Sequence, residues 1–219
     1  MHPVLVLPLN EGSGDIVYDR SGYNNHGTIY GGATWQKEWR DWLLSFDGVD
    51  DCVDCGDVGL NGLAQVSMSA WIKTSETTKN RTIVMAGKNL AGKFGFGMQV
   101  WEGYLRVIMS DPNDDFAYNR ELSSTFIADG SWHFVTIVLK DGYVYYYIDG
   151  VEDPNSPMTG FANTHNSISR LMLGNAPWTA YYFIGIIGEV LVFRKALSGE
   201  QIAFLSSLFR GEKRSPPVF

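Results

Sequence analysis

Short apolar runs alternate with polar residues along the chain and are separated by Gly, Asn, Asp and Pro. In Val66–Thr74, for example, Ser67 and Ser69 stand between apolar residues. Alternation with a period of two predicts β-strands that bury one face. The runs that predict strands are Val4–Leu9, Thr28–Trp35, Leu43–Asp47, Val66–Thr74, Thr82–Met85, Phe94–Trp101, Tyr104–Met109, Trp132–Lys140, Tyr143–Ile148, Leu171–Leu173 and Phe183–Phe193.

Local signals add one hairpin and one helix to these strands. Asp141-Gly142 suits a type I′ turn between two of the runs. Ser198 and Gln201 form a capping box, after which apolar residues recur at helical spacing up to Phe209. Many short strands with one terminal helix predict an all-β, two-sheet antiparallel jelly-roll sandwich. A parallel α/β fold would need helices between the strands.

Composition fits one folded domain over residues 1–209. Apolar residues make up 45% of the 219 residues and charged residues 19%, so a large core can be buried. The counts of 17 Lys plus Arg and 24 Asp plus Glu give 17 − 24 = −7, which disfavours nucleic acid as a partner. The chain contains no apolar run long enough for a transmembrane helix, so no membrane insertion is expected. Residues 210–219 are basic and then Pro-rich, which predicts a terminal arm or linker.

The sequence contains little evidence for an export signal or for a redox or zinc site. Residues 1–8 are apolar but short, lack a basic start and carry two prolines, so they predict a first strand rather than a signal peptide. Cys52 and Cys55 form one CxxC, with no second pair for zinc and no βαβ context for a redox site. Two reduced thiols, at least one of them buried, are expected.

Five blocks of sequence resemble one known family in its own order. They are Leu9–Gly14 with Asp19–Thr28, Phe46–Asp51, Ser69–Lys73, Trp132–Val135 with Tyr147–Gly150, and Ile187–Val190 with Arg194–Ser198. Together they resemble the laminin-G-like, concanavalin A-like lectin/glucanase jelly rolls over about residues 4–209. The resemblance implies an antiparallel sandwich, often with one structural calcium and often binding glycans. It also implies a module of secreted, cell-surface or virion proteins.

Two positions depart from the family pattern. Gly188 stands where members often carry an Asp, so one metal ligand of the family is missing. The segment Trp35–Trp42 replaces what is usually a Gly-rich turn. Both departures weaken any transfer of ligand specificity from the family.

The loop from Asp19 to Gly27 is the predicted calcium site. Calcium takes six to eight oxygen ligands, and Asp19, Ser21 and Asn24 offer side-chain oxygens here. Gly27 lets the backbone turn inward, and Glu189 is expected as a distant carboxylate, because the closing strand of the family often returns beside the first. The alternative is an Asx-rich loop that bonds only to itself.

Two further acidic clusters carry weaker predictions. Asp111, Asn113 and Asp114 can supply partners for sugar hydroxyls, directly or through an ion, but a solvated loop is the favoured explanation. Asp47, Asp50 and Asp51 are expected to serve a hairpin turn.

Carbohydrate sites need an aromatic ring to stack on a sugar and short polar groups to bond hydroxyls. Trp101 ends a predicted strand, and Trp178 and Tyr181 flank a predicted loop before the last strand. These three are the predicted ligand-binding aromatics. Trp35, Trp71 and Trp132 occupy strand or family-core positions and are expected to be structural.

Catalytic patterns are missing from the sequence. It has no paired strand carboxylates of the glucanase kind and no Gly-x-Ser-x-Gly elbow, and its four His form no metal pair. The sequence therefore predicts a non-catalytic, extracellular, cell-surface or virion module that binds a glycan or polysaccharide. The alternative is a virion or cell-surface structural or assembly protein on the same fold, which would form a homo-oligomer or larger assembly. A hydrolase is disfavoured.

Overall fold

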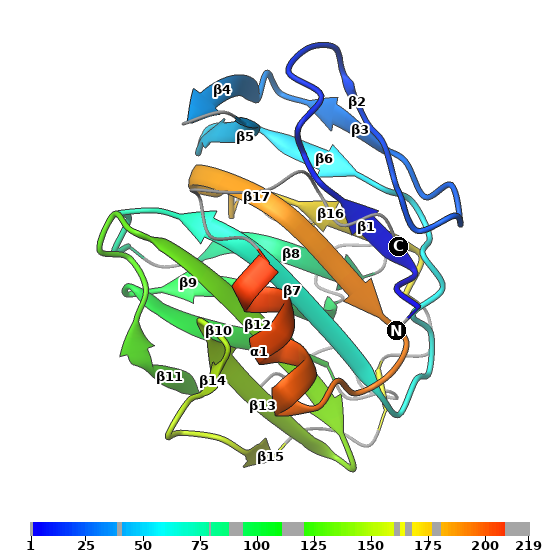
Figure 1. The fold of residues 1–219 in the computed structure, drawn as a ribbon, viewed down its shortest axis with the longest axis vertical. Coiled ribbons are helices and arrows are strands. Elements are labelled where there is room, and N and C mark those ends of the chain that lie inside the picture. The colour runs from blue at the N-terminus through cyan, green and yellow to red at the C-terminus, as the bar shows by residue number, and fades with distance from the viewer. Residues whose placement is uncertain are drawn as a thin grey trace.

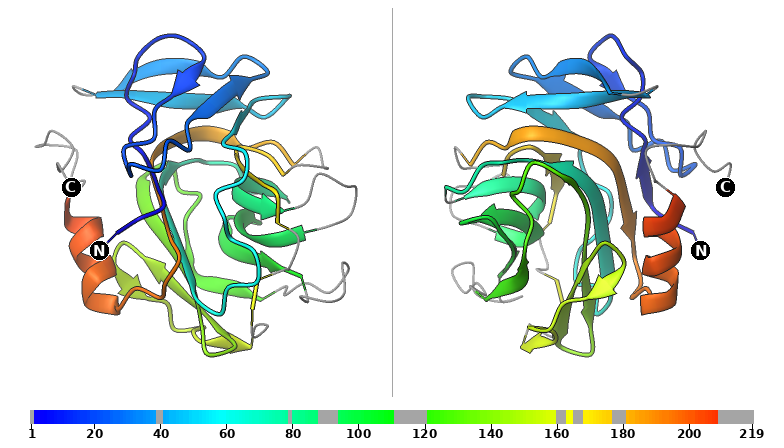
Figure 2. Two further views of the ribbon diagram at one scale, coloured as in Figure 1. Left: turned by 90° about the vertical axis from the view of Figure 1, so that its right-hand side faces the viewer. Right: turned by 60° about the vertical axis from the view of Figure 1, so that its left-hand side comes forward.

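A computed structural model of the chain describes residues 2–38, 41–78, 80–87, 94–110, 121–159, 163–164, 168–176 and 181–208. Two antiparallel sheets lie face to face, and one short helix packs outside them (Figures 1 and 2). This arrangement confirms the predicted two-sheet sandwich. Among the described residues, no helix is long and apolar enough to cross a membrane.

The first sheet has nine strands, in the order β14-β13-β12-β7-β17-β5-β4, with β1 paired to β17 and β15 to β13. Its strands are β1 (Leu5–Leu7), β4 (Thr34–Glu38), β5 (Asp41–Asp47), β7 (Val66–Lys73), β12 (Trp132–Lys140), β13 (Tyr143–Ile148), β14 (Val151–Glu152), β15 (Met158–Thr159) and β17 (Ile184–Phe193).

The second sheet has eight strands, in the order β11-β10-β9-β8-β16-β6-β3-β2. Its strands are β2 (Ile16–Val17), β3 (Gly27–Tyr30), β6 (Cys52–Asp54), β8 (Arg81–Gly87), β9 (Phe94–Trp101), β10 (Tyr104–Met109), β11 (Leu122–Phe126) and β16 (Arg170–Leu173). The edge strand β11 is therefore two strands away from β9.

The first and last strands lie side by side, as predicted. β1 pairs antiparallel with β17, with Leu5 opposite Val192 and Leu7 opposite Val190. The nine-stranded sheet thus pairs two strands that lie near opposite ends of the described chain.

The main core fills the space between the sheets and includes Phe96, Tyr146 and Phe183, all fully buried. Tyr146 places a polar group there, and its hydroxyl both donates to the carbonyl of Glu121 and accepts from the amide of Val107. Burial raises the pKa of this phenol, because its anion would lose solvation. Satisfying the hydroxyl on both sides removes the cost of burying it.

Helix α1 (Gly199–Leu208) covers the outer side of the nine-stranded sheet (Figure 2). Its buried Ile202 and Leu205 join a second apolar cluster with sheet residues such as Trp71, Phe134 and Phe193. Ser198 caps the helix as predicted: Gln201 donates to its hydroxyl, and Ser198 donates back to the Gln201 side chain. The capping box explains why the helix begins there.

Four strands match their predicted bounds in full, namely β9, β10, β12 and β13. The Asp141-Gly142 turn has φ values of 53° and 78°, as the predicted type I′ hairpin requires. Cys52 and Cys55 are free and buried, which confirms the expected thiols, and burial raises the pKa of Cys52 to about 11.

One predicted strand was wrong as a single element. Thr28–Trp35 divides into β3 in one sheet and β4 in the other. Gly31 and Gly32 between them have φ values of 86° and 121°, which side chains rarely adopt. A Cβ on Gly31 would lie 2.2 Å from the carbonyl oxygen of Asp50. The chain changes sheets at these two glycines.

Candidate functional site

The hairpin between β9 and β10 gathers aromatic side chains at one end of the eight-stranded sheet. Trp101 and Tyr104 are directly opposite each other, and Phe126 of β11 is opposite Tyr104. Val100 and Leu105 point into the main core. Because side chains alternate along a strand, Trp101 and Tyr104 point to the outer face of the sheet. The three aromatic residues therefore line up across three neighbouring strands.

The indole of Trp101 is stacked against an arginine. The Arg106 guanidinium carbon lies 4.2 Å from the centre of the Trp101 ring, and Nη1 donates to the side chain of Asn80 at 3.4 Å. Arg106 is only 5% exposed, so its charge is largely withdrawn from solvent. A cation on the face of an indole is attracted to the ring's electrons. One face of Trp101 is consequently in use within the protein.

Tyr104 and Phe126 form an exposed corner. Their ring centres are 5.4 Å apart and their planes meet at 79°. Phe126 is 40% exposed. Its ring lies over Gly103, where a Cβ would come within 2.1 Å of it. The turn glycine thus leaves the space that the ring occupies.

Polar side chains continue the outer face beside these aromatics. Gln99 lies across from Thr82 and donates to its hydroxyl at 3.0 Å. Both residues are fully buried. Among the described residues the other amide atom of Gln99, Oε1, has no hydrogen-bond partner. A buried acceptor without a partner lowers stability, so native proteins contain few of them and each one calls for an explanation.

The predicted Tyr181 lies at the same end of the sheet as Trp101. Its carbonyl accepts a hydrogen bond from the amide of Thr82, which is opposite Gln99 of the next strand. The neighbouring carbonyl of Tyr182 accepts from Arg81. The other predicted ligand-binding residues, Trp178, Asp111, Asn113 and Asp114, lie outside the described residues. Sequence reasoning missed Arg106 and Phe126 as members of this group.

At the loop predicted to bind calcium, Asp19 accepts four hydrogen bonds. Its Oδ1 accepts from the amides of Val6 and Ser21 at 2.9 and 2.8 Å, and its Oδ2 from the Ser21 hydroxyl and the Asn25 amide at 2.6 and 2.9 Å. Asn25 and Ser21 also donate to the carbonyl of Val4. The carboxylate therefore fastens the loop to β1 and its flanking residue.

These contacts do not fit a calcium site on Asp19. Donor hydrogens surround the carboxylate where a cation would need bare oxygens. Gly27 packs against Val17 and Val53, whose methyl groups a Cβ would meet at 2.6 and 2.5 Å. Asn24 turns the loop with a φ of 60°. The calcium site of Asp19, Ser21, Asn24, Gly27 and Glu189 stays a prediction, and the hydrogen-bonded loop is the alternative that the geometry favours.

Glu189 lies in β17 where the pairing with β7 shifts register, between Ile187 and Val190. Burial raises the pKa of its carboxyl to about 7, because the anion is poorly solvated there. Within the described part of the chain, neither Glu189 nor Asp19 belongs to a group of three acidic, His or Cys ligand atoms lying within 4.8 Å of one another.

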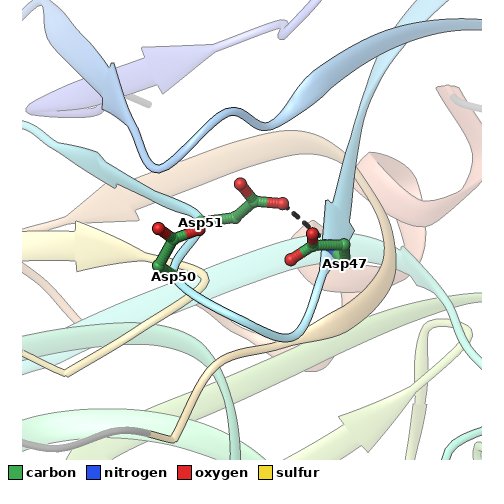
Figure 3. A group of neighbouring side chains, drawn as sticks. All are labelled: Asp47, Asp50 and Asp51. Atoms are coloured by element: carbon green, nitrogen blue, oxygen red, sulfur yellow. Dashed lines mark hydrogen bonds between the residues drawn. The ribbon is translucent and has the colours of Figure 1, made fainter.

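Asp47, Asp50 and Asp51 do form such a group (Figure 3). Asp51 accepts from the amide of Asp47 at 2.8 Å, and Asp47 accepts from the amide of Val49. Burial and the neighbouring Asp47 charge raise the pKa of Asp51. The hydrogen bonds agree with a turn at these residues, but the predicted hairpin was wrong, because β5 and β6 on either side of the turn belong to different sheets.

Comparison with known proteins places this sandwich in a family. A family model for the concanavalin A-like lectin/glucanases superfamily matches residues 47–203. The chain belongs to this superfamily. The match covers the β9–β10 hairpin, β11 and the first half of helix α1, so the candidate site lies within the matched part of the chain.

Related sequences and structures are adhesion and binding domains. Adhesion G-protein coupled receptor V1 of Danio rerio is 23% identical over 145 residues, which cover 64% of this chain and 2% of the receptor. Domain 4 of AbnA, an extracellular arabinanase from Geobacillus stearothermophilus, solved with arabinotriose, has a TM-score of 0.75 at 20% identity and covers 93% of this chain and 98% of that domain.

Two toxin structures share the fold as well. The binding domain of Paraclostridial Mosquitocidal Protein 1 has a TM-score of 0.73 at 14% identity. A structure of botulinum neurotoxin type C, whose cell entry depends on two ganglioside molecules, has a TM-score of 0.70 at 19% identity. They match 94% of this chain, which spans 52% and 51% of those chains. At these identities the likeness shows the fold.

Proposed function

We propose that this domain is a non-catalytic carbohydrate-binding or adhesion module that acts outside the cell or on a cell or virion surface. The observation that carries the proposal is the aromatic group Trp101, Tyr104 and Phe126 on the outer face of the eight-stranded sheet. Aromatic faces stack on sugar rings, and nearby polar groups bond hydroxyls.

The comparisons support the same function. The AbnA domain was solved with arabinotriose, and botulinum neurotoxin type C enters cells through gangliosides. Family membership makes a glycan the natural ligand class for an exposed aromatic group on this sheet. Fold alone hosts many functions, so the residues of the site carry the argument.

A glycan panel tests the proposal directly. Binding of neutral and acidic oligosaccharides, arabinotriose among them, is followed by the change in Trp fluorescence and repeated on a glycan array. Contacts made mainly by stacking should give dissociation constants on the order of millimolar for a single site, improving when the domain is presented in several copies.

Two outcomes would favour the alternative, a structural or assembly role, over glycan binding. One is the absence of binding to every glycan on the array. The other is a concentration-dependent oligomer in light scattering that forms without any sugar. Hydrolysis of a bound oligosaccharide, followed by the release of reducing ends, would contradict the non-catalytic part of the proposal.

A further inference from the structure

Among the residues that the structure describes, the solvent-facing surface of the candidate site is aromatic, and the two arginines beside it are engaged within the protein. Tyr104 and Phe126 present their rings at a corner, and Phe126 is 40% exposed. Arg106 is 5% exposed and lies against Trp101. A ligand that reaches this end of the sheet therefore meets ring carbons and a phenol hydroxyl before it meets a positive charge.

The second arginine beside the site is engaged too. Arg81 donates to the carbonyl of Tyr182 and lies 3.5 Å from the carboxylate of Glu76. The whole chain has a net charge of −7. A carboxylate on a sugar would therefore approach a protein of net negative charge, which is unfavourable.

We infer that the site selects neutral glycans, and that the corner of Tyr104 and Phe126 is the surface on which the sugar stacks. This inference rests on the proposed function and names its ligand class and contact residues. Trp101 is a positioning residue in this arrangement, because its stacked Arg106 holds the hairpin end in place. The two perpendicular rings allow one to lie under the apolar face of a sugar while the other borders its edge.

Gly103 gives the corner its shape. Its φ of 88° and the 2.1 Å approach to the Phe126 ring leave no room for a side chain. A Gly103→Ala substitution should push the ring away without removing any aromatic group. This variant separates the position of the ring from its presence.

The test compares neutral oligosaccharides with sialylated counterparts, arabinotriose, lactose and sialyllactose among them, by isothermal titration at low and high salt. We expect the neutral chains to bind more tightly, with little dependence on salt. Phe126→Ala should lower the affinity about tenfold. Gly103→Ala should weaken binding in the same direction. Tyr143→Ala is the matched control, because Tyr143 is 46% exposed on the other sheet and should leave binding unchanged.

Melting curves of each variant check that the domain is folded. Tighter binding of sialyllactose that weakens steeply with salt would overturn the neutral class. Wild-type affinity in both folded Phe126→Ala and folded Gly103→Ala would overturn the corner while leaving the proposed function intact. Failure of the wild-type domain to bind any glycan would remove the proposed function itself.

Discussion

The two sheets present different outer surfaces. The nine-stranded sheet buries Trp71, Phe134 and Phe193 beneath helix α1, so its outer face is a second apolar core. The eight-stranded sheet bears Gln99, Arg106 and an aromatic corner on its outer face, and the only helix in the described part of the chain lies elsewhere. Gln99 and Arg106 are themselves buried, so the contacts that this face offers a ligand lie at the aromatic corner, where Phe126 is 40% exposed. A protein that optimised stability alone would have no need for the buried polar pair of Gln99 and Thr82.

The largest expected effect comes from the covered face. Phe134 is fully buried, and its ring centre lies 5.2 Å from that of Trp71. Phe134→Ala should lower the free energy of unfolding by about 3–5 kcal/mol, because it removes apolar contacts and leaves a cavity. Urea denaturation measures the loss. The affinity of the folded fraction for a glycan should stay unchanged, and a large loss of that affinity would show that the two faces are coupled.

Asp19 links a loop of the eight-stranded sheet to the nine-stranded sheet, and its replacement should give the next largest loss of stability. It ties the loop between β2 and β3 to Val6 of β1 through a charged acceptor. Asp19→Ala should lower the free energy of unfolding by about 3 kcal/mol, because several hydrogen-bond donors lose their carboxylate acceptor. The measurement is the melting temperature with and without a chelator.

Chelation separates the hydrogen-bonded loop from the calcium hypothesis. If the hydrogen bonds hold the loop, chelator leaves the wild-type melting temperature unchanged. A calcium site would instead stabilise the native state by mass action, so chelator would lower the melting temperature in the wild type and not in Asp19→Ala.

Replacing the buried polar pair of Gln99 and Thr82 should change the stability in the opposite sense. Thr82→Val combined with Gln99→Met removes both hydrogen-bonding partners and the Gln99 Oε1 atom, which has no partner among the described residues. Replacing both partners by apolar groups of similar shape is nearly neutral or stabilising, by up to about 1 kcal/mol. A midpoint in urea at or above the wild-type value would show that the pair is not kept for stability. A loss of more than 1 kcal/mol would make this face a structural one.

The smallest effect is a pH dependence at the start of strand β12. His133 bonds to Asp149 at 2.8 Å and to Asp129 at 3.2 Å. The hydrogen bond that the His133 ring donates to Asp149 raises the pKa of His133 despite the opposing effect of burial, and Asp129 acts in the same direction. A raised pKa in the folded state stabilises the fold fully below pH about 6.5, the unfolded value, and this stability is lost as pH rises through the folded pKa.

His133→Gln should flatten that dependence, with a difference of about 1 kcal/mol or less. Denaturation midpoints between pH 5 and pH 9 measure it. An NMR titration of the His133 ring checks the direction independently: a midpoint below that of a model peptide would contradict the assignment.

The sequence was most informative where local pattern and packing agree. The strands β9, β10, β12 and β13 are rich in apolar and aromatic residues and end at turns, so their bounds were predictable. Trp101 could be placed at a strand end because Glu102-Gly103 follows it. The superfamily blocks fixed the order of elements but not which side chains meet across strands.

The rest depended on contacts between strands. β11 reads Leu-Ser-Ser-Thr-Phe, which is too polar to predict as a strand, since it lies at a sheet edge and buries little. Phe126 was missed with it. The stacking of Arg106 on Trp101 depends on the register of two strands, which no local pattern reveals. The hydrogen bonds to the Asp19 carboxylate could not be predicted without the position of Val6. An Asx-rich loop has the same sequence pattern whether or not it binds a cation.

The pairing of β1 with β17 has a consequence for how the domain folds as it is synthesised. Leu5 cannot pair with Val192 until the residues of β17 have been synthesised. The first strand of the domain therefore stays unpaired while most of the domain is being made. Contacts between residues so distant in sequence slow folding, because a long loop must close before they form. An exposed, unpaired apolar segment during that interval is a site at which nascent chains associate or recruit a chaperone.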